Sequence, residues 1–188
     1  MANKTTVALS KKQYRDIIWT MKRGGAGFKP NIRIATALVI EANLGLRIED
    51  VLRLRLCDII EDGTRYRMNI VEKKTGKKRC FTVPNEVYKY IESYAEKRGR
   101  KESDILFDIG ERQVQRMLQI ITEYLGYKNI GTHSFRKYFA TEIYENSGHD
   151  IILMQGLLQH GSVMTTQRYI GKSSEAIEKA LKAHVHLL

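Results

Sequence analysis

The sequence predicts a mainly α-helical protein that carries a small antiparallel β-hairpin, an α+β fold. Apolar residues recur three and four positions apart along most of the chain, which is the spacing of one face of an α-helix. Residues 65–83 instead alternate apolar and polar side chains, as a half-buried strand does. Hydrophobic residues make up 43% of the chain and only two prolines occur, a composition typical of an ordered globular protein.

Three helices are expected in the first part of the chain. Ser10 can cap a helix that runs to about Arg23, where the glycine-rich sequence RGGAG ends it. Pro30 fits the first turn of a second helix, and Gly45 ends that helix. A short helix follows at about 48–53. The second helix has one apolar stripe, which consists of Ala35, Leu38, Val39 and Ala42.

The alternating stretch predicts two strands and a turn. The turn residues Lys74, Thr75, Gly76 and Lys77 separate the strands, so the expected element is a β-hairpin with a basic tip. The apolar side chains that alternate along the two strands are Tyr66, Met68, Ile70, Phe81 and Val83.

Helical spacing returns after Pro84 and continues to the end of the chain. Ala176, Ile177, Ala180 and Leu181 mark one face of the last expected helix. No internal repeat or linker interrupts the pattern, so we expect a tail at 1–9 and one domain at 10–188. The helices in this part are expected at about 85–98, 111–125, 134–146, 150–158, 163–169 and 174–183.

The charge of the chain indicates the class of its partner. Lys and Arg total 32 against 21 Asp and Glu, a net charge of +11. An excess of this size favours a polyanion, either nucleic acid or an anionic membrane surface. A membrane-surface protein would concentrate its basic residues on one amphipathic helix, whereas here they spread over loops, the hairpin and several helices. The charge therefore favours nucleic acid, with solubility as the alternative explanation, and does not by itself name the partner.

Other features indicate where the protein works. No apolar run reaches the roughly 18 residues of a membrane span, and the polar N-terminus lacks the apolar core of a signal peptide. Cys57 and Cys80 lie far apart without a CxxC pattern, which argues against a structural zinc site. We therefore expect a cytoplasmic protein with no membrane contact and no metal site.

Two groups of residues have the chemistry to bind a phosphate. His133 and Arg136 lie three positions apart at an expected helix start, which Thr132 or Ser134 can cap. Arg47 follows Gly45, and a nearby carboxylate could orient its guanidinium towards a phosphate. Each group has an ordinary alternative, a solvated helix start for the first and a surface salt bridge for the second.

The hairpin tip KKTGKKR forms a third group of candidates. A hairpin that projects lysines can contact phosphates, and one lysine can donate a proton to a departing oxygen. A solvated charged turn is the alternative. The basic residues of this tip are Lys73, Lys74, Lys77, Lys78 and Arg79.

The last candidate is a tyrosine in the sequence LLQHGSVMTTQRYI. Tyr169 lies nine residues after His160 and next to Arg168. Phenol has a pKa of about 10, so a tyrosine becomes a nucleophile only where neighbouring groups stabilise its anion and remove its proton. A histidine and an arginine supply both functions.

The order of these groups resembles that of the tyrosine recombinase (phage integrase) family. The resemblance covers Ser10 to the C-terminus, the whole catalytic domain of that family. GLRIEDVLRL resembles the first arginine box of the family, and KTGKK followed by VP resembles its catalytic hairpin. THSFRKYFAT with LLQHGSVMTTQRYI resembles its second box.

The resemblance implies a role for each candidate. Tyr169 would be the nucleophile that forms a 3′-phosphotyrosyl bond to DNA, and His133 the base that accepts its proton. Lys74 would protonate the departing 5′-oxygen, although Lys73, Lys77 or Lys78 would replace it if the register of the turn differs. The other implied roles are phosphate binding by Arg47, Arg136 and His160, support of Arg47 by Asp50, and DNA contact by Lys73, Lys77, Lys78 and Arg79.

The resemblance also implies how the protein would work as a whole. The reaction needs no cofactor, neither metal nor ATP, and takes place in a homo-tetramer on DNA, with a monomer or weak oligomer expected in its absence. Segments such as the helix at about 174–183 often dock on a neighbouring protomer in this family, and packing on its own domain is the alternative. Family members usually carry a separate N-terminal core-binding domain, so the chain is expected to be either a fragment or a minimal recombinase.

Two other functions fit parts of the same pattern. A type IB topoisomerase uses the same residues and the same covalent bond, but relaxes supercoils as a monomer. A catalytically silent DNA-binding module would use the basic hairpin without needing Tyr169.

Overall fold

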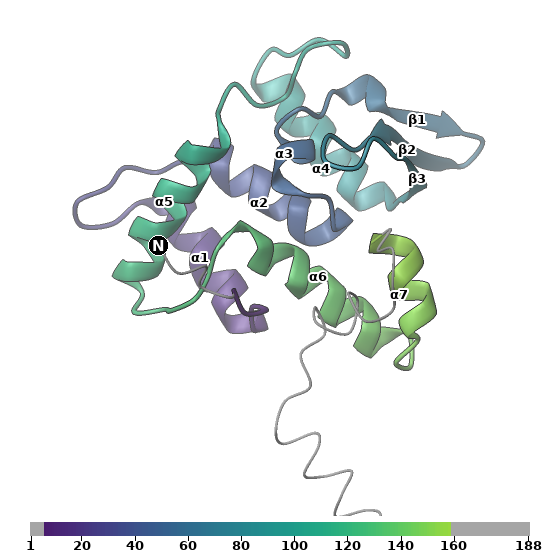
Figure 1. The fold of residues 1–188 in the computed structure, drawn as a ribbon. Coiled ribbons are helices and arrows are strands. Elements are labelled where there is room, and N and C mark those ends of the chain that lie inside the picture. Colours follow the sequence, from purple (N-terminus) through teal and green to yellow (C-terminus); the bar gives the residue numbers. More distant parts are fainter. Residues whose placement is uncertain (1–5, 159–188) are drawn as a thin grey trace, which may run out of the picture.

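The computed structural model describes residues 6–158. Helices make up most of this part of the chain and a small sheet lies at one edge, so the mainly α fold with a small antiparallel sheet is confirmed (Figure 1). The helices are α1 (Lys11–Arg23), α2 (Ile32–Leu44), α3 (Ile48–Val51), α4 (Asn85–Lys97), α5 (Glu111–Tyr124), α6 (Thr132–Asn146) and α7 (Ile151–Leu158). The strands are β1 (Ile59–Asp62), β2 (Arg65–Val71) and β3 (Lys78–Val83), and a 3₁₀ turn at Leu56–Asp58 leads into β1.

Local hydrogen bonds set the ends of the first helix. The Oγ of Ser10 accepts a hydrogen bond from the backbone N–H of Gln13 at 3.1 Å, and the Gln13 side chain accepts from the Ser10 N–H at 2.9 Å. This reciprocal pair satisfies backbone donors that the helix itself leaves free. The expected start and end of α1 are confirmed.

The second helix begins slightly later than the sequence predicts. Asn31 is its cap and accepts from the backbone N–H of Ile34 at 3.1 Å, so Pro30 precedes the cap instead of lying in the first turn. Gly45 ends α2 as predicted, with a φ of +58°, and its N–H donates to the carbonyl of Glu41. Glycine adopts this left-handed conformation without steric cost.

The predicted hairpin is present as the antiparallel pair β2 and β3. A third strand, β1, pairs with β2 on its other edge, in the order β1-β2-β3. Met68 at the middle of β2 pairs with Ile59 on one side and Phe81 on the other, and its side chain is fully buried. The sequence did not predict β1, because its four residues are too short to show an alternating pattern.

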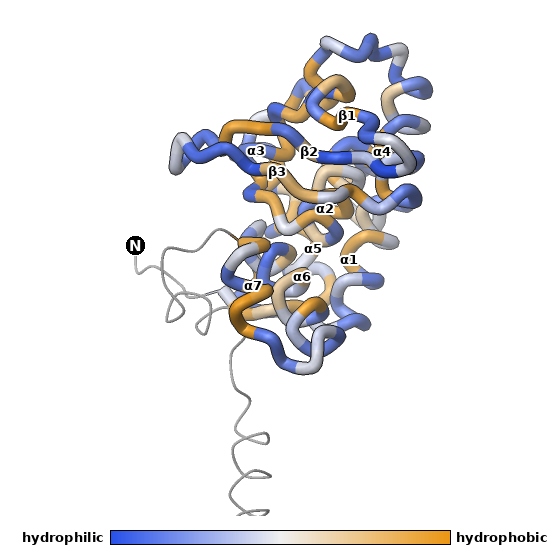
Figure 2. Tube along the Cα trace, turned by 90° about the vertical axis from the view of Figure 1, so that its right-hand side faces the viewer, coloured by the Kyte–Doolittle hydropathy of each residue, from blue (hydrophilic) through white to orange (hydrophobic). Residues whose placement is uncertain are grey.

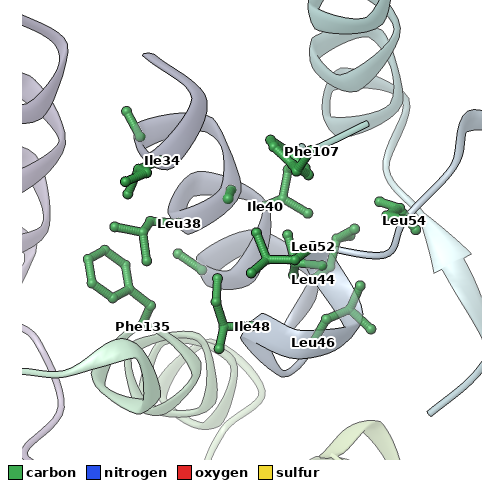
Figure 3. Packing of buried hydrophobic residues seen from close by; sticks show 14 of the residues in the cluster. Ile34, Leu38, Ile40, Leu44, Leu46, Ile48, Leu52, Leu54, Phe107 and Phe135 are labelled. Carbon is green, nitrogen blue, oxygen red and sulfur yellow. The ribbon is translucent and has the colours of Figure 1, made fainter. Parts of the chain in front are cut away.

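Helix α2 lies at the centre of the hydrophobic core. Its side chains Ile34, Leu38, Ile40 and Leu44 point into a cluster that also receives Phe107 and Phe135 (Figure 3). Burial on every side explains why α2 is almost entirely apolar, whereas α1 and α5 are amphipathic.

A second, smaller cluster joins α6 to α7. Ala140 of α6 packs against Met154 and Leu158 of α7, and Phe139 covers them. In the turned view, the sheet and α4 lie above the layer that contains α6 and α7 (Figure 2). The β2–β3 connection, which carries the predicted catalytic lysine, lies beside the short helix α3 (Figure 1).

Candidate active site

Arg47 lies at the start of α3, directly after the glycine turn that ends α2. Its side chain is 15% exposed, and its Nη1 donates to Oε2 of Glu72 at 2.5 Å. Glu72 is the first residue after β2 and its side chain is completely buried. The structure therefore fixes the Arg47 guanidinium against the base of the hairpin connection.

Asp50 has a different partner from the one that the sequence suggests. Its Oδ1 accepts a hydrogen bond from the backbone N–H of Lys73 at 2.8 Å, whereas the carboxylate bonded to Arg47 belongs to Glu72. Burial raises the pKa of Asp50, while the hydrogen bond from Lys73 and the charge of Arg47 act in the opposite direction. Asp50 thus holds the hairpin connection on α3, and the carboxylate that hydrogen-bonds to Arg47 is that of Glu72.

The hairpin tip presents its lysines to solvent. Lys73, Lys74, Lys77 and Lys78 are all exposed, which is compatible with contact to DNA. Lys73 is also tied to α3, because its Nζ lies 3.1 Å from Oε2 of Glu49.

Arg79 does not belong to this exposed tip, which corrects the sequence grouping. It is 2% exposed, and its Nη1 pairs with Oε1 of Glu72 at 3.1 Å. Its Nη2 donates to the carbonyls of Leu44 at 3.2 Å and Leu157 at 2.8 Å, and its guanidinium lies 4.9 Å from the ring centroid of Phe81. Arg79 cannot reach DNA from this position, because it is buried and hydrogen-bonded within the protein.

His133 and Arg136 both lie in the first turns of α6, which begins at Thr132. Gly131 is the cap residue, and its N–H donates to Oγ of Ser134 at 3.1 Å, so neither predicted cap residue occupies the cap position. His133 is exposed, whereas Arg136 is completely buried. Arg136 donates to the carbonyls of Gly45 and Leu158, at 2.5 and 2.8 Å, which ties α6 to the turn before Arg47 and to the end of α7.

Hydrogen bonds join the segments that carry the predicted site residues. Arg136 of α6 donates to the carbonyl of Gly45, two residues before Arg47. Oε2 of Glu72 binds both Arg47 and Thr75, the neighbour of Lys74. The pKa of His133 is lowered by partial desolvation and by the positive charges of Arg136, Lys74 and Arg47. The lowered pKa keeps the imidazole neutral near pH 7, the state in which it can accept a proton.

The sequence interpretation missed two buried acids near these residues. Glu72 binds Arg47, and Glu41 of α2 lies close enough to Arg136 for that guanidinium to lower its pKa. Burial has the larger effect on Glu41 and raises its pKa well above the usual range. A single acid within the otherwise apolar segment of α2 was the available signal for Glu41.

Several predictions fall on other parts of the chain. His160, Tyr169 and the helices expected at about 163–169 and 174–183 lie outside the described residues. Within residues 6–158, no group of three or more His, Cys, Asp or Glu side chains could hold a metal ion. No helix in the same range is long and apolar enough to cross a membrane.

The sequence is similar to those of known recombinases. The model of the phage integrase family matches residues 8–176. The chain is 31% identical to the probable integrase/recombinase YoeC of Bacillus subtilis, over 74% of this chain and 78% of that protein. It is 32% identical to the tyrosine recombinase XerC of Pelobacter propionicus, over 74% of this chain but only 48% of that protein. The chain thus spans about half the length of that relative.

The fold is also that of solved recombinase structures. The chain superposes with a TM-score of 0.73 on the XerH site-specific recombinase in a post-cleavage complex with its palindromic difH substrate. The two sequences are 21% identical, and the superposition covers 97% of this chain and 54% of the XerH chain. The catalytic domain of bacteriophage HP1 integrase superposes with a TM-score of 0.65, at 17% identity, and covers 95% of both chains. At these identities the similarity establishes the shared fold.

Proposed function

Because the chain belongs to the phage integrase family and has the fold of a tyrosine recombinase catalytic domain, we propose that it is a site-specific DNA recombinase. The proposed reaction breaks and rejoins DNA strands through a 3′-phosphotyrosyl intermediate. The observation that supports the proposal is the set of hydrogen bonds that link Arg47 to the neighbour of Lys74, through Glu72, and Arg136 to the turn before Arg47. Cations whose charges lower the pKa of His133 suit the binding and reaction of a phosphodiester.

The proposed cleavage step conserves the number of phosphoester bonds. The phenolic oxygen of Tyr169 attacks the scissile phosphorus, an O–P bond forms, and the bond from phosphorus to the 5′-oxygen breaks. His133 accepts the phenolic proton, and Lys74 donates a proton to the departing oxygen, which leaves as a 5′-hydroxyl. Reversal of the step rejoins a strand without ATP, because the phosphotyrosine retains the phosphoester bond.

The arginines would stabilise the charge that develops on the phosphate. Two fixed guanidiniums supply positive charge and directed N–H donors to the non-bridging oxygens. Arg47 is partly exposed and can reach such a group, whereas Arg136 is completely buried in the described form. Contact between Arg136 and DNA therefore requires that the guanidinium first becomes accessible.

The proposed partner is double-stranded DNA, bound by a homo-tetramer. The net charge of +11 and the exposed lysines Lys73, Lys74, Lys77 and Lys78 support binding to the phosphate backbone.

Covalent trapping tests the nucleophile. The protein is incubated with labelled, nicked DNA from the sequences that flank its gene, in the presence of EDTA, and adducts that resist SDS but not protease are measured. We expect an adduct with the wild type and with the control Tyr124→Phe, which changes an exposed tyrosine of α5, but none with Tyr169→Phe. An adduct that persists in Tyr169→Phe would refute the assignment. Salt-sensitive binding without any adduct would favour a DNA-binding module, and relaxation of supercoils by a monomer would favour a topoisomerase.

A modified substrate tests which lysine is the general acid. A sulfur in place of the bridging 5′-oxygen makes the leaving group stable without protonation, so it should restore cleavage only to a variant that lacks the acid. We expect this restoration for Lys74→Met. Lys77→Met serves as the control, and restoration of that variant instead would assign the role to Lys77.

A further inference from the structure

Glu72 lies between the two elements that carry the predicted catalytic groups Arg47 and Lys74. It follows the last residue of β2, and its backbone N–H donates to the carbonyl of Lys77 at 3.0 Å. Its own carbonyl accepts from the N–H of Gly76 at 2.9 Å, so the backbone of Glu72 closes the connection that presents Lys74. The residue is 1% exposed and cannot itself touch DNA.

The carboxylate of Glu72 binds three side-chain donors. Oε2 accepts from Nη1 of Arg47 at 2.5 Å and from Oγ1 of Thr75 at 2.8 Å, and Oε1 accepts from Nη1 of Arg79 at 3.1 Å. Burial alone would raise the pKa of Glu72, but the hydrogen bonds from Thr75, Arg47 and Arg79 outweigh it and lower the pKa. Glu72 is therefore an ionised carboxylate that accepts hydrogen bonds from two guanidiniums at once.

Arg79 extends this network to the end of α7. Its other terminal nitrogen, Nη2, donates to the carbonyls of Leu44 and Leu157. Leu44 ends α2 just before Arg47, and Leu157 lies in the last turn of α7. The pair of Glu72 and Arg79 thus joins three segments that are far apart in the sequence.

We propose that Glu72 is a positioning residue for DNA cleavage, which holds Arg47 in register with the hairpin connection that bears Lys74. The proposal rests on the proposed recombinase function. A single carboxylate that bonds to Arg47 and to Thr75 links the guanidinium to the residue next to Lys74. The two predicted groups would then approach the phosphate as one unit, and neither would have to be oriented separately.

The matched test is Glu72→Gln, which keeps the size of the side chain and removes its charge. Glu72→Asp keeps the charge but is one methylene shorter, so it cannot reach both guanidiniums with the same geometry. Glu49→Gln is the control, because Glu49 is a partly exposed carboxylate that pairs with Lys73 of the same connection. Single-turnover cleavage of nicked DNA, DNA affinity and the thermal unfolding of each variant are measured.

We expect cleavage by Glu72→Gln to fall by about 100-fold, the effect of misplacing a reacting group by about 1 Å. DNA affinity should change far less, Glu72→Asp should retain more cleavage than Glu72→Gln, and Glu49→Gln should cleave like the wild type. In an Arg47→Lys background, Glu72→Gln should add little further loss, because both changes affect the same group. Full cleavage by Glu72→Gln, or additive losses in the double variant, would overturn the proposal.

A second measurement separates this proposal from the proposed function. The side-chain N–H signals of Arg47 in NMR spectra of the DNA-free protein report whether its guanidinium is restrained. We expect restrained signals in the wild type and in Glu49→Gln, and averaged signals in Glu72→Gln. Restrained signals in Glu72→Gln would overturn the positioning role even if cleavage falls. If Arg47 depends on Glu72 while the wild type forms no DNA adduct, the restraint of Arg47 by Glu72 is supported, but the recombinase function fails and with it the role of Glu72 in cleavage.

Discussion

The substitution Glu41→Gln should change how the stability of the protein depends on pH. Glu41 lies in α2 and is completely buried, and neither of its carboxyl oxygens has a hydrogen-bond partner in the described part of the chain. Burial raises its pKa well above the ordinary value of 4.5, and the negative charge of Glu111 acts in the same direction. The positive charge of Arg136 lowers the pKa but does not outweigh burial.

The sign of the effect follows from where the proton is bound. Between pH 4.5 and the raised pKa, the folded protein keeps a proton on Glu41 that the unfolded chain has already lost. The contribution of Glu41 to stability is therefore greatest below pH 4.5 and declines as pH rises through this window. The decline reaches about 1.4 kcal/mol for each pH unit, the free energy of one unit of pKa difference.

Glutamine has nearly the shape of the protonated acid but cannot ionise. Relative to the wild type, Glu41→Gln should gain stability as pH rises above about 4.5, by up to about 1.4 kcal/mol for each unit, until Glu41 ionises in the folded protein. Subtracting the wild-type free energy of unfolding at each pH removes the contributions of other titrating groups, including His133, because both proteins contain them.

Urea unfolding at several pH values between 5 and 8 measures this difference directly. Glu96→Gln is the matched control, because it removes a carboxylate that is exposed on α4 instead of one that is buried in the core. A constant difference between Glu41→Gln and the wild type would refute the reasoning, since it would mean that Glu41 ionises at the same pH in both states.

Two further substitutions test the geometry around the candidate active site. Gly45→Ala should destabilise the protein by about 2–4 kcal/mol, because the added Cβ would lie 2.4 Å from the ring of Phe139 at a φ of +58°. Gly63→Ala is the control in urea unfolding, because Gly63 has a similar φ of +64° but no atom within 4 Å of the added Cβ. This control should lose only about 1 kcal/mol of stability. Equal losses of stability in the two variants would contradict the proposed clash. Lys74→Met should raise the pKa of His133, as followed by NMR titration of the imidazole, because the lysine charge lowers it in the wild type. An unchanged titration would place Lys74 too far from His133 to share a site.

The helices and the hairpin could be predicted from the sequence because their signals are local. Ser10 and Gln13 lie three positions apart and form the cap of α1 by themselves. Gly45 likewise ends α2 through its own conformation. Long-range partners have no such signal, which is why the hydrogen bonds from Lys73 to Asp50 and from Arg47 to Glu72 could not be predicted.

The burial of Glu72 and Arg79 is indicated by the alternation of inward-facing residues along the strands, although both side chains are charged. Glu72 continues the inward alternation of Met68 and Ile70 in β2, and Arg79 is in phase with Val83 in β3. Alternation places both charged side chains on the face of the hairpin that turns to the core. The charge of Arg79 led to its grouping with the basic tip, and no role was predicted for Glu72. Considered together, an acid and a base in phase on paired strands indicate a buried ion pair.

Two buried arginines from different elements bind the end of α7. Arg79 of the sheet donates to the carbonyl of Leu157, and Arg136 of α6 donates to the carbonyl of Leu158. The last carbonyls of a helix have no partner within the helix and carry partial negative charge, so a guanidinium is a favourable ligand for them.

The same two arginines also contact the residues around Arg47. Arg136 binds the carbonyl of Gly45, and Arg79 binds Glu72, the partner of Arg47. A change at either arginine therefore disturbs both Arg47 and the end of α7, the point from which the chain continues towards His160 and Tyr169. Loss of cleavage in an Arg136 variant consequently cannot be assigned to phosphate binding alone, unless the position of α7 is measured in the same variant.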